Sequence, residues 1–200
     1  ITLALSDTIA ENVIAMMHRF REEGALISFD VNYRASLWSE EKARETILSV
    51  LPMVDFFFAS EESSRRMFGM TGTHEEIQEQ FAKEYPNLRM IASTKRKVIT
   101  STRQSFNSLV YDCESGEHFI DAPYDNIDVV DRIGSGDAYV AGALYGALKY
   151  GDIHSAARYG DALASVKNTV IGDMTEVDIV DIDRVIKNHT TTGPKSEMVR

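Results

Sequence analysis

Residues 131–138 of this 200-residue chain are DRIGSGDA, and a helix-forming stretch, YVAGALYGALKYG, follows at once. Two glycines flank Ser135 where the helix is expected to begin, and glycine permits tight backbone geometry and the close approach of an anion. The free N–H groups of such a turn would point at one spot, and the helix dipole would add to their attraction for negative charge. The segment therefore predicts an anion-binding turn at the start of a helix.

Asp137 lies in the first turn of the predicted helix. A carboxylate there could accept the proton of an attacking hydroxyl, while Gly134, Ser135 and Gly136 hold a phosphoryl group in transfer. The same residues would also suit a helix start in which Ser135 or Asp137 is only an N-cap. The segment is neither a Walker A loop nor a dinucleotide fingerprint, because no Gly-Lys-Ser/Thr follows and a third glycine is missing.

Working outward, apolar segments alternate between helix-like and strand-like patterns. One helix is expected from a cap at Asp7 or Thr8 to about Glu23, and others over about 39–51, 60–69, 73–84, 134–151, 152–168 and 178–188. Strands are expected at ALISFDVN, DFFFAS and RMIAST, and KVITST, SFNSLVYD and EHFIDA suggest an antiparallel edge. The alternation predicts an α/β fold whose mainly parallel sheet is covered on both faces. Gly142 and Gly146 would let one helix lie close to that sheet.

Composition excludes several classes of partner. The net charge of −10 disfavours nucleic acid and anionic membranes. The single cysteine, Cys113, excludes an internal disulfide and suits a cytoplasmic protein, and the histidines lack metal-ligand spacing, so no metal site is expected. The opening run from Ile1 resembles the end of a strand, so we expect an upstream part of the fold, and the polar residues 191–200 are expected to form a tail.

A second polar group follows the first predicted strand and comprises Asp30, Asn32 and Arg34. In an extended chain alternate residues face one side, so these side chains would line one surface. An arginine can grip a carboxylate with two parallel hydrogen bonds, which lysine cannot imitate. The alternative is a polar strand-to-helix loop with Arg34 in a surface ion pair.

The pattern D-x-x-G-S-G-D-A-Y at residues 131–139, before an Ala/Gly-rich helix, resembles the C-terminal motif of ribokinase-like (PfkB) carbohydrate kinases. The resemblance covers nearly the whole chain. It implies that residues 1–190 are the C-terminal portion of a single ribokinase-like domain, a three-layer Rossmann-like sandwich whose N-terminal part and lid lie outside this chain. It also implies that Asp137 is the catalytic base, that the Gly134–Gly136 turn holds the phosphates, and that ATP with Mg²⁺ is the donor.

Two segments resemble the 2-keto-3-deoxygluconate kinase branch of that family. The first is D-x-N-x-R-x-x-L-W from Asp30, and by resemblance Arg34 would bind the carboxylate of the sugar acid and Asn32 would lie near the phosphates. The second is KNTVIGD at 167–173, where the resemblance places Asp173 near the substrate. A helix end with a glycine turn and a solvated aspartate is the alternative for the second segment.

The resemblance also implies nucleotide contacts. Ser60 and Glu61 resemble an acidic element of the family, although first-turn acids also complement a helix dipole. Ser93 and Thr94 open the segment STKRKV, at which many relatives carry Lys-x-Gly-x-x-Gly. Here three basic residues, 95–97, replace the glycines, either as an attraction for phosphate or carboxylate or as a solvated strand edge.

Together these features imply an ATP-dependent phosphotransferase that converts 2-keto-3-deoxygluconate to its 6-phosphate. A kinase for another sugar, such as fructose or ribose, is the alternative within the class. A non-catalytic sugar- or nucleotide-binding relative is the alternative outside it, and an intact Asp137 argues against that alternative. The expected partners are the small-molecule sugar acid and ATP, and a homodimer through the lid is a further expectation.

Overall fold

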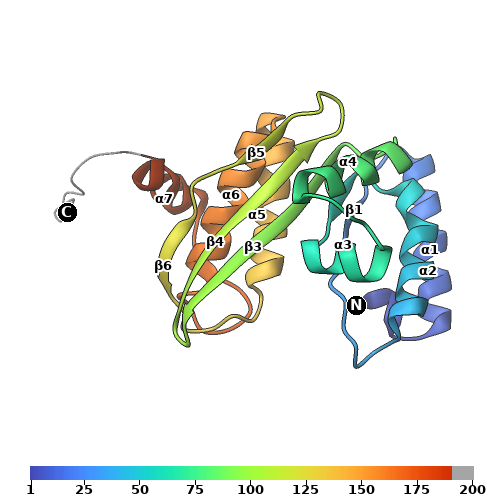
Figure 1. Cartoon of the computed structure of the whole chain (residues 1–200), viewed down its shortest axis with the longest axis horizontal. Helices are drawn as coiled ribbons and strands as arrows, with labels where there is room; N and C mark the ends of the chain where they lie inside the picture. The colour runs from blue at the N-terminus through green and yellow to red at the C-terminus, as the bar shows by residue number, and fades with distance from the viewer. Residues whose placement is uncertain (191–200) are drawn as a thin grey trace. The chain divides into compact units, whose positions relative to one another are not determined.

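The computed structural model describes residues 1–190, so the tail predicted for residues 191–200 lies outside the described residues. Helices and strands alternate along the chain (Figure 1), which confirms the predicted α/β class. The chain forms two compact units. The first unit contains residues 1–94 and 109–119, and the second contains residues 95–108 together with the chain from residue 120 onward.

The first unit contains a parallel sheet in which β1 (Ser28–Asp30) pairs with β2 (Phe56–Phe58), and β2 pairs with the start of β3 (Met90–Thr100). This is the parallel arrangement that alternating strands and helices predicted. The end of β4 (Arg103–Asp112) and most of β5 (His118–Ile120) also belong to this unit. Its helices are η1 (Thr2–Ala4), α1 (Asp7–Glu22), α2 (Glu40–Val50), η2 (Leu51–Met53), α3 (Glu61–Phe68) and α4 (His74–Glu84).

Side-chain caps set the starts of these helices. The hydroxyl oxygens of Ser39 and Ser60 accept hydrogen bonds from backbone N–H groups in the first turns of α2 and α3. Thr73 forms a reciprocal capping box at the start of α4. The cap predicted for α1 at Asp7 or Thr8 was wrong, because Ser6 accepts the capping bond at 3.2 Å and Asp7 already lies inside the helix.

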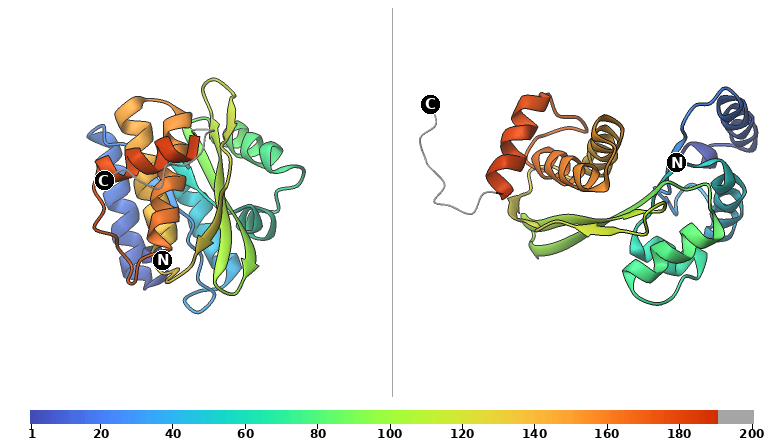
Figure 2. Two further views of the ribbon diagram at one scale, coloured as in Figure 1. Left: turned by 90° about the vertical axis from the view of Figure 1, so that its left-hand side faces the viewer. Right: turned by 90° about the horizontal axis from the view of Figure 1, so that it is seen from above.

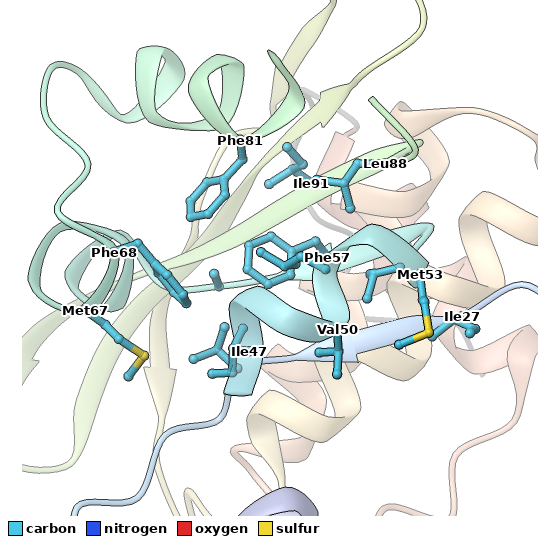
Figure 3. Close-up of a cluster of buried hydrophobic side chains, with 14 of the residues drawn as sticks. Ile27, Ile47, Val50, Met53, Phe57, Met67, Phe68, Phe81, Leu88 and Ile91 are labelled. Carbon is cyan, nitrogen blue, oxygen red and sulfur yellow. The ribbon is translucent and has the colours of Figure 1, made fainter. Parts of the chain in front are cut away.

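The core of the first unit is built around β2, whose three phenylalanines are buried. The ring of Phe57 contacts Phe68 and Phe81 edge to face, with centroid distances of 6.5 and 5.1 Å (Figure 3). Such pairs add to the stabilisation that burial of apolar area supplies. Other members of this cluster come from α2, η2, α4, β3 and the segments just before β1 and β3, and they are Ile27, Ile47, Val50, Met53, Ile77, Leu88 and Ile91.

The second unit combines strands with a helical hairpin. The first residues of β4 pair antiparallel with β6 (Tyr124–Asp128), and Arg103 lies opposite Asp128. Helices α5 (Ser135–Tyr150) and α6 (Ile153–Lys167) pack along each other, and α7 (Ile179–Thr190) follows (Figures 1 and 2). The separate strands expected at RMIAST and KVITST are one continuous strand, β3. Within residues 1–190, no helix is both long enough and apolar enough to span a membrane.

Glycines set the close approach of α5 and α6. A Cβ atom added to Gly142 would lie 2.7 Å from the carbonyl carbon of Tyr159, and one added to Gly146 would lie 2.7 Å from the amide nitrogen of Ala156. Both neighbours are backbone atoms of α6, so a larger side chain could not be accommodated by a change of rotamer. The expectation that these glycines approach a sheet was therefore wrong, because they face a helix.

Candidate functional site

The predicted anion-binding turn forms the N-terminus of α5, which begins at Ser135. The N-cap is Gly134, whose φ of 77° is left-handed and favours glycine. The alternative in which Ser135 or Asp137 is the N-cap is therefore not what the chain forms. The N–H of Ala138 donates to the carbonyl of Gly134 at 2.8 Å. The preceding N–H groups, those of Gly136 and Asp137, lie in the first turn, where a helix supplies no acceptor of its own.

The outer face of this turn is open. A Cβ atom added to Gly136 would meet no atom of the described residues within 4 Å, so the packing of the chain does not require a glycine there. Asp137 follows directly in the first turn of α5 and its side chain is exposed. A small residue beside an exposed carboxylate at a helix N-terminus leaves room for an anionic group to approach the backbone.

The inner face of the turn packs against the loop that follows α6. A Cβ atom added to Gly134 would lie 2.7 Å from the carbonyl carbon and 2.9 Å from the Cα of Asp173. Asp173 is itself exposed, so its side chain is accessible beside the turn. The second unit thus brings together five predicted site residues: Gly134, Ser135, Gly136, Asp137 and Asp173.

Asp131 also belongs to this site, although no separate role was predicted for it from the sequence. Its carboxylate accepts hydrogen bonds from the N–H groups of Ile133 and Gly172, each at 3.0 Å. These two bonds, with a smaller contribution from the Lys167 ammonium, hold the pKa of Asp131 below its ordinary value. Asp131 therefore remains a carboxylate that links the turn to the loop after α6. The sequence does contain a signal for this contact. Asp131 precedes Ile133 by two residues, which is the spacing at which an aspartate accepts a backbone hydrogen bond in an Asx turn.

The polar group after β1 lies in the first unit and is not extended. Strand β1 ends at Asp30, and Asn32 has a φ of 32° and donates its N–H to the Asp30 carboxylate at 3.1 Å. The expected alternation of Asp30, Asn32 and Arg34 on one face was therefore wrong, because this local turn interrupts it. The Arg34 guanidinium is exposed and donates to the carbonyl of Tyr33 at 3.1 Å.

The residues assigned to the nucleotide by resemblance, Ser60, Glu61, Ser93 and Thr94, also lie in the first unit. Ser60 caps α3, and Glu61 in its first turn forms an ion pair with Arg65 at 2.7 Å. That ion pair fits the alternative in which Glu61 stabilises the first turn of α3. A role of Glu61 in nucleotide binding stays a prediction.

Ser93 is only 4% exposed. Its Oγ lies 2.7 Å from Nε2 of His74 and accepts a hydrogen bond from the Gln78 amide at 3.0 Å. The hydroxyl of Ser93 therefore takes part in a buried network of the first unit. Thr94, the next residue of β3, is half-buried.

A cavity of about 630 Å³ lies within the second unit. Lys95 and Lys97 of β3 line it together with Ser105 and Asn107 of β4. The volume is in the range that binds small organic molecules. Two of the three basic residues that replace the family glycines therefore border a hollow, where their charge can act on a ligand.

Most of the chain is similar to known carbohydrate kinases. Residues 2–179 match the model of the pfkB family of carbohydrate kinases. The chain is 30% identical over 187 residues to the 2-dehydro-3-deoxygalactonokinase of Haloferax volcanii, covering 94% of this chain and 55% of that protein. It is 33% identical over 133 residues to a fructokinase of Escherichia coli, covering 65% of this chain and 38% of that protein.

A solved structure of 2-dehydro-3-deoxygluconokinase from Thermotoga maritima matches with a TM-score of 0.83 and 26% identity, covering 90% of this chain and 55% of that one. The chain spans about half the length of the curated relatives it matches. A short motif alone would not produce a match over residues 2–179, which includes residues of both units, and the chain belongs to the pfkB family of carbohydrate kinases.

Proposed function

We propose that the protein containing this chain transfers the γ-phosphoryl group of ATP to a hydroxyl of 2-keto-3-deoxygluconate, giving the 6-phosphate. The observation that carries the proposal is the turn Gly134–Asp137, where the first turn of α5 begins, Gly136 borders open space and the Asp137 carboxylate is exposed. This arrangement supplies the two elements that phosphoryl transfer needs from a protein, namely a base and a fixed set of hydrogen-bond donors.

In the proposed reaction, Asp137 accepts the proton of the sugar hydroxyl as that oxygen attacks phosphorus. The N–H groups of Gly136 and Asp137 stabilise the negative charge on the transferring group, and the dipole of α5 reinforces them. The missing side chain at Gly136 lets the phosphoryl oxygens reach the backbone. We propose that Asp173, whose backbone packs against Gly134, contacts the sugar in the same region.

We assign nucleotide binding to Asn32, Ser60, Glu61, Ser93 and Thr94 of the first unit. We assign phosphate binding to the glycines of the turn in the second unit. Ser93 would contribute through its backbone, because its hydroxyl already contacts His74 and Gln78. Lys95 and Lys97 would supply local positive charge in a chain with a net charge of −10. Mg²⁺ would arrive with the nucleotide and neutralise phosphate charge.

The sugar acid is favoured by Arg34, whose exposed guanidinium can form paired hydrogen bonds with a carboxylate. Two relatives named above act, by their names, on 2-keto-3-deoxy sugar acids. A neutral sugar such as fructose is the second candidate, since a fructokinase is also among the relatives. We further propose a cytoplasmic location and a homodimer.

The test is ADP release by the full-length gene product with Mg·ATP and a panel of 2-keto-3-deoxygluconate, 2-keto-3-deoxygalactonate, gluconate, fructose and ribose. Turnover confined to the keto-deoxy acids is the expected result. Turnover on a neutral sugar would keep the kinase and remove the role of Arg34. Absence of turnover on every sugar would favour a non-catalytic binding protein.

A further inference from the structure

Lys167, the last residue of α6, is a fully buried lysine. Burying an ammonium group costs free energy unless hydrogen bonds replace its lost water. Its Nζ donates to the carbonyl oxygens of Val170 at 3.1 Å and of Asp131 at 3.3 Å. The first contact is an ordinary helix-end contact. The second contact is with a residue 36 positions away in the sequence, so this lysine also connects the end of α6 to the segment that precedes α5.

The contacts of Asp131 complement those of Lys167. The ammonium binds carbonyl groups of the 130–133 and 168–172 segments, while the Asp131 carboxylate binds N–H groups of the same two segments, at Ile133 and Gly172. The carbonyl of Asn168 adds a bond from the N–H of Val130 at 2.8 Å. Each charged side chain thus satisfies backbone groups of both loops, and charge-assisted hydrogen bonds are stronger than neutral ones.

These two loops bracket the turn at the start of α5. The 130–133 segment leads directly into Gly134, and the segment after α6 ends at Asp173, whose backbone packs on Gly134. The direction of the N–H groups at Gly136 and Asp137 therefore depends on how the two loops are held together.

We propose that Lys167 and Asp131 are positioning residues that hold these two loops together through their hydrogen bonds. This arrangement, here called the loop lock, sets the geometry of the phosphoryl-transfer turn. The proposal rests on the proposed function for its consequence on catalysis. Neither residue needs to touch the substrate. The Lys167 ammonium donates one hydrogen bond to each loop, so replacing this side chain removes a bond from both loops at once.

The test uses Lys167→Met in the full-length gene product, because methionine is a flexible, uncharged side chain of related length. A misplacement of about 1 Å in a catalytic constellation costs about 10²-fold in rate, so we expect kcat to fall by about that factor. KM for the sugar acid should change little, since the residue makes no contact that distinguishes bound sugar from free sugar. The matched control is Lys149→Met, which alters an exposed lysine in the last turn of α5 and should retain the parental kcat.

Backbone hydrogen exchange supplies a readout that does not depend on activity. In Lys167→Met, amides of residues 131–138 and 168–173 should exchange faster, while those of β1, β2 and α4 keep the parental rates. Should Lys167→Met fail to fold, Asp131→Asn tests the same lock, because the amide keeps one acceptor oxygen and loses the charge. It should show the same fall in kcat and the same local exchange.

Parental kcat in a folded Lys167→Met or Asp131→Asn protein would overturn the proposal. Faster exchange spread evenly over the second unit would also overturn it, since it would show a general loss of stability. An inactive parental protein whose variants still show the local exchange change would sink the kinase assignment and leave the lock in place.

Discussion

Gly134 lies directly against the backbone of Asp173, so that a Cβ atom at Gly134 would sit 2.7 Å from the Asp173 carbonyl carbon. The contact joins the turn at the start of α5 to the loop after α6, two segments that are 39 positions apart at these residues. Because the atoms on both sides are backbone, neither segment can yield by rotating a side chain. The approach of the two loops therefore requires glycine at position 134.

We expect Gly134→Ala to destabilise the protein and to remove activity. The left-handed φ alone costs an alanine about 1–2 kcal/mol, and the clash with Asp173 adds to it. The matched variant is Gly136→Ala, where the added methyl group meets nothing within 4 Å. It should leave the melting temperature unchanged and lower kcat/KM by about 10²-fold, because the phosphoryl group loses its approach to the backbone. Thermal unfolding and ADP release measure both effects. Parental activity in Gly136→Ala would remove the turn from the reaction.

Asp137→Asn should slow turnover by about 10²–10⁴-fold, the usual scale for loss of a general base. Folding should be unaffected, because the side chain is exposed. The control is Asp181→Asn, which removes a carboxylate from an exposed i,i+3 pair with Arg184 on α7. Such a surface pair contributes little to stability, so its kcat should match the parental value. Near-normal turnover of Asp137→Asn would exclude Asp137 as the base.

Arg34→Ala should raise KM selectively for sugars that carry a carboxylate, because the paired hydrogen bonds to that group are lost. Arg34→Lys should recover only part of the affinity, since a lysine ammonium cannot form the paired geometry. Steady-state kinetics on 2-keto-3-deoxygluconate and on the best neutral sugar of the panel separate the effects. An equal loss on both substrates would indicate that Arg34 acts on the loop after β1 and not on the carboxylate.

Asp161 of α6 should make stability depend on pH. Burial raises the pKa of this carboxyl to about 7, the neighbouring charge of Asp121 adds to the increase, and hydrogen bonds from Ser108 oppose it. The native state therefore holds a proton that the unfolded chain releases above its ordinary pKa of 3.8, so stability falls as the pH rises from about 4 to about 7.

Asp161→Asn cannot ionise and should abolish this fall, which amounts to at most about 4 kcal/mol at one pKa unit per 1.36 kcal/mol. Urea unfolding at pH 5 and pH 7.5 measures the difference. Asp128→Asn, at an exposed position paired with Arg103, should keep the parental pH dependence. If the unfolding free energy of Asp161→Asn changed with pH as much as that of the parental protein, a group other than Asp161 would cause the pH dependence.

Local signals predicted much of the architecture. The caps at Ser39 and Thr73 and the apolar spacing behind them place α2 and α4 within one or two residues of the expected bounds. The FFF run of β2 was predictable as a buried strand, because continuous apolar segments occur where helices cover both faces of a sheet. Turns decided by one backbone angle were not predictable in this way. The φ of 32° at Asn32 broke the alternation that polar residues on a strand would have shown.

The motif at 131–138 by itself determined the start of α5 and the position of Asp137 in the first turn, because these depend on hydrogen bonds and backbone angles within a few residues. The N-cap is Gly134, whereas the sequence had offered Ser135 or Asp137 for that position. Three other features depended on tertiary structure. They are the helix surface that Gly142 and Gly146 approach, the contact of Gly134 with Asp173, and the burial of the Lys167 ammonium between two loops. Those features join segments that are 10 to 39 positions apart. The packing of α5 on α6 decides which segments meet, and no local sequence pattern contains that information.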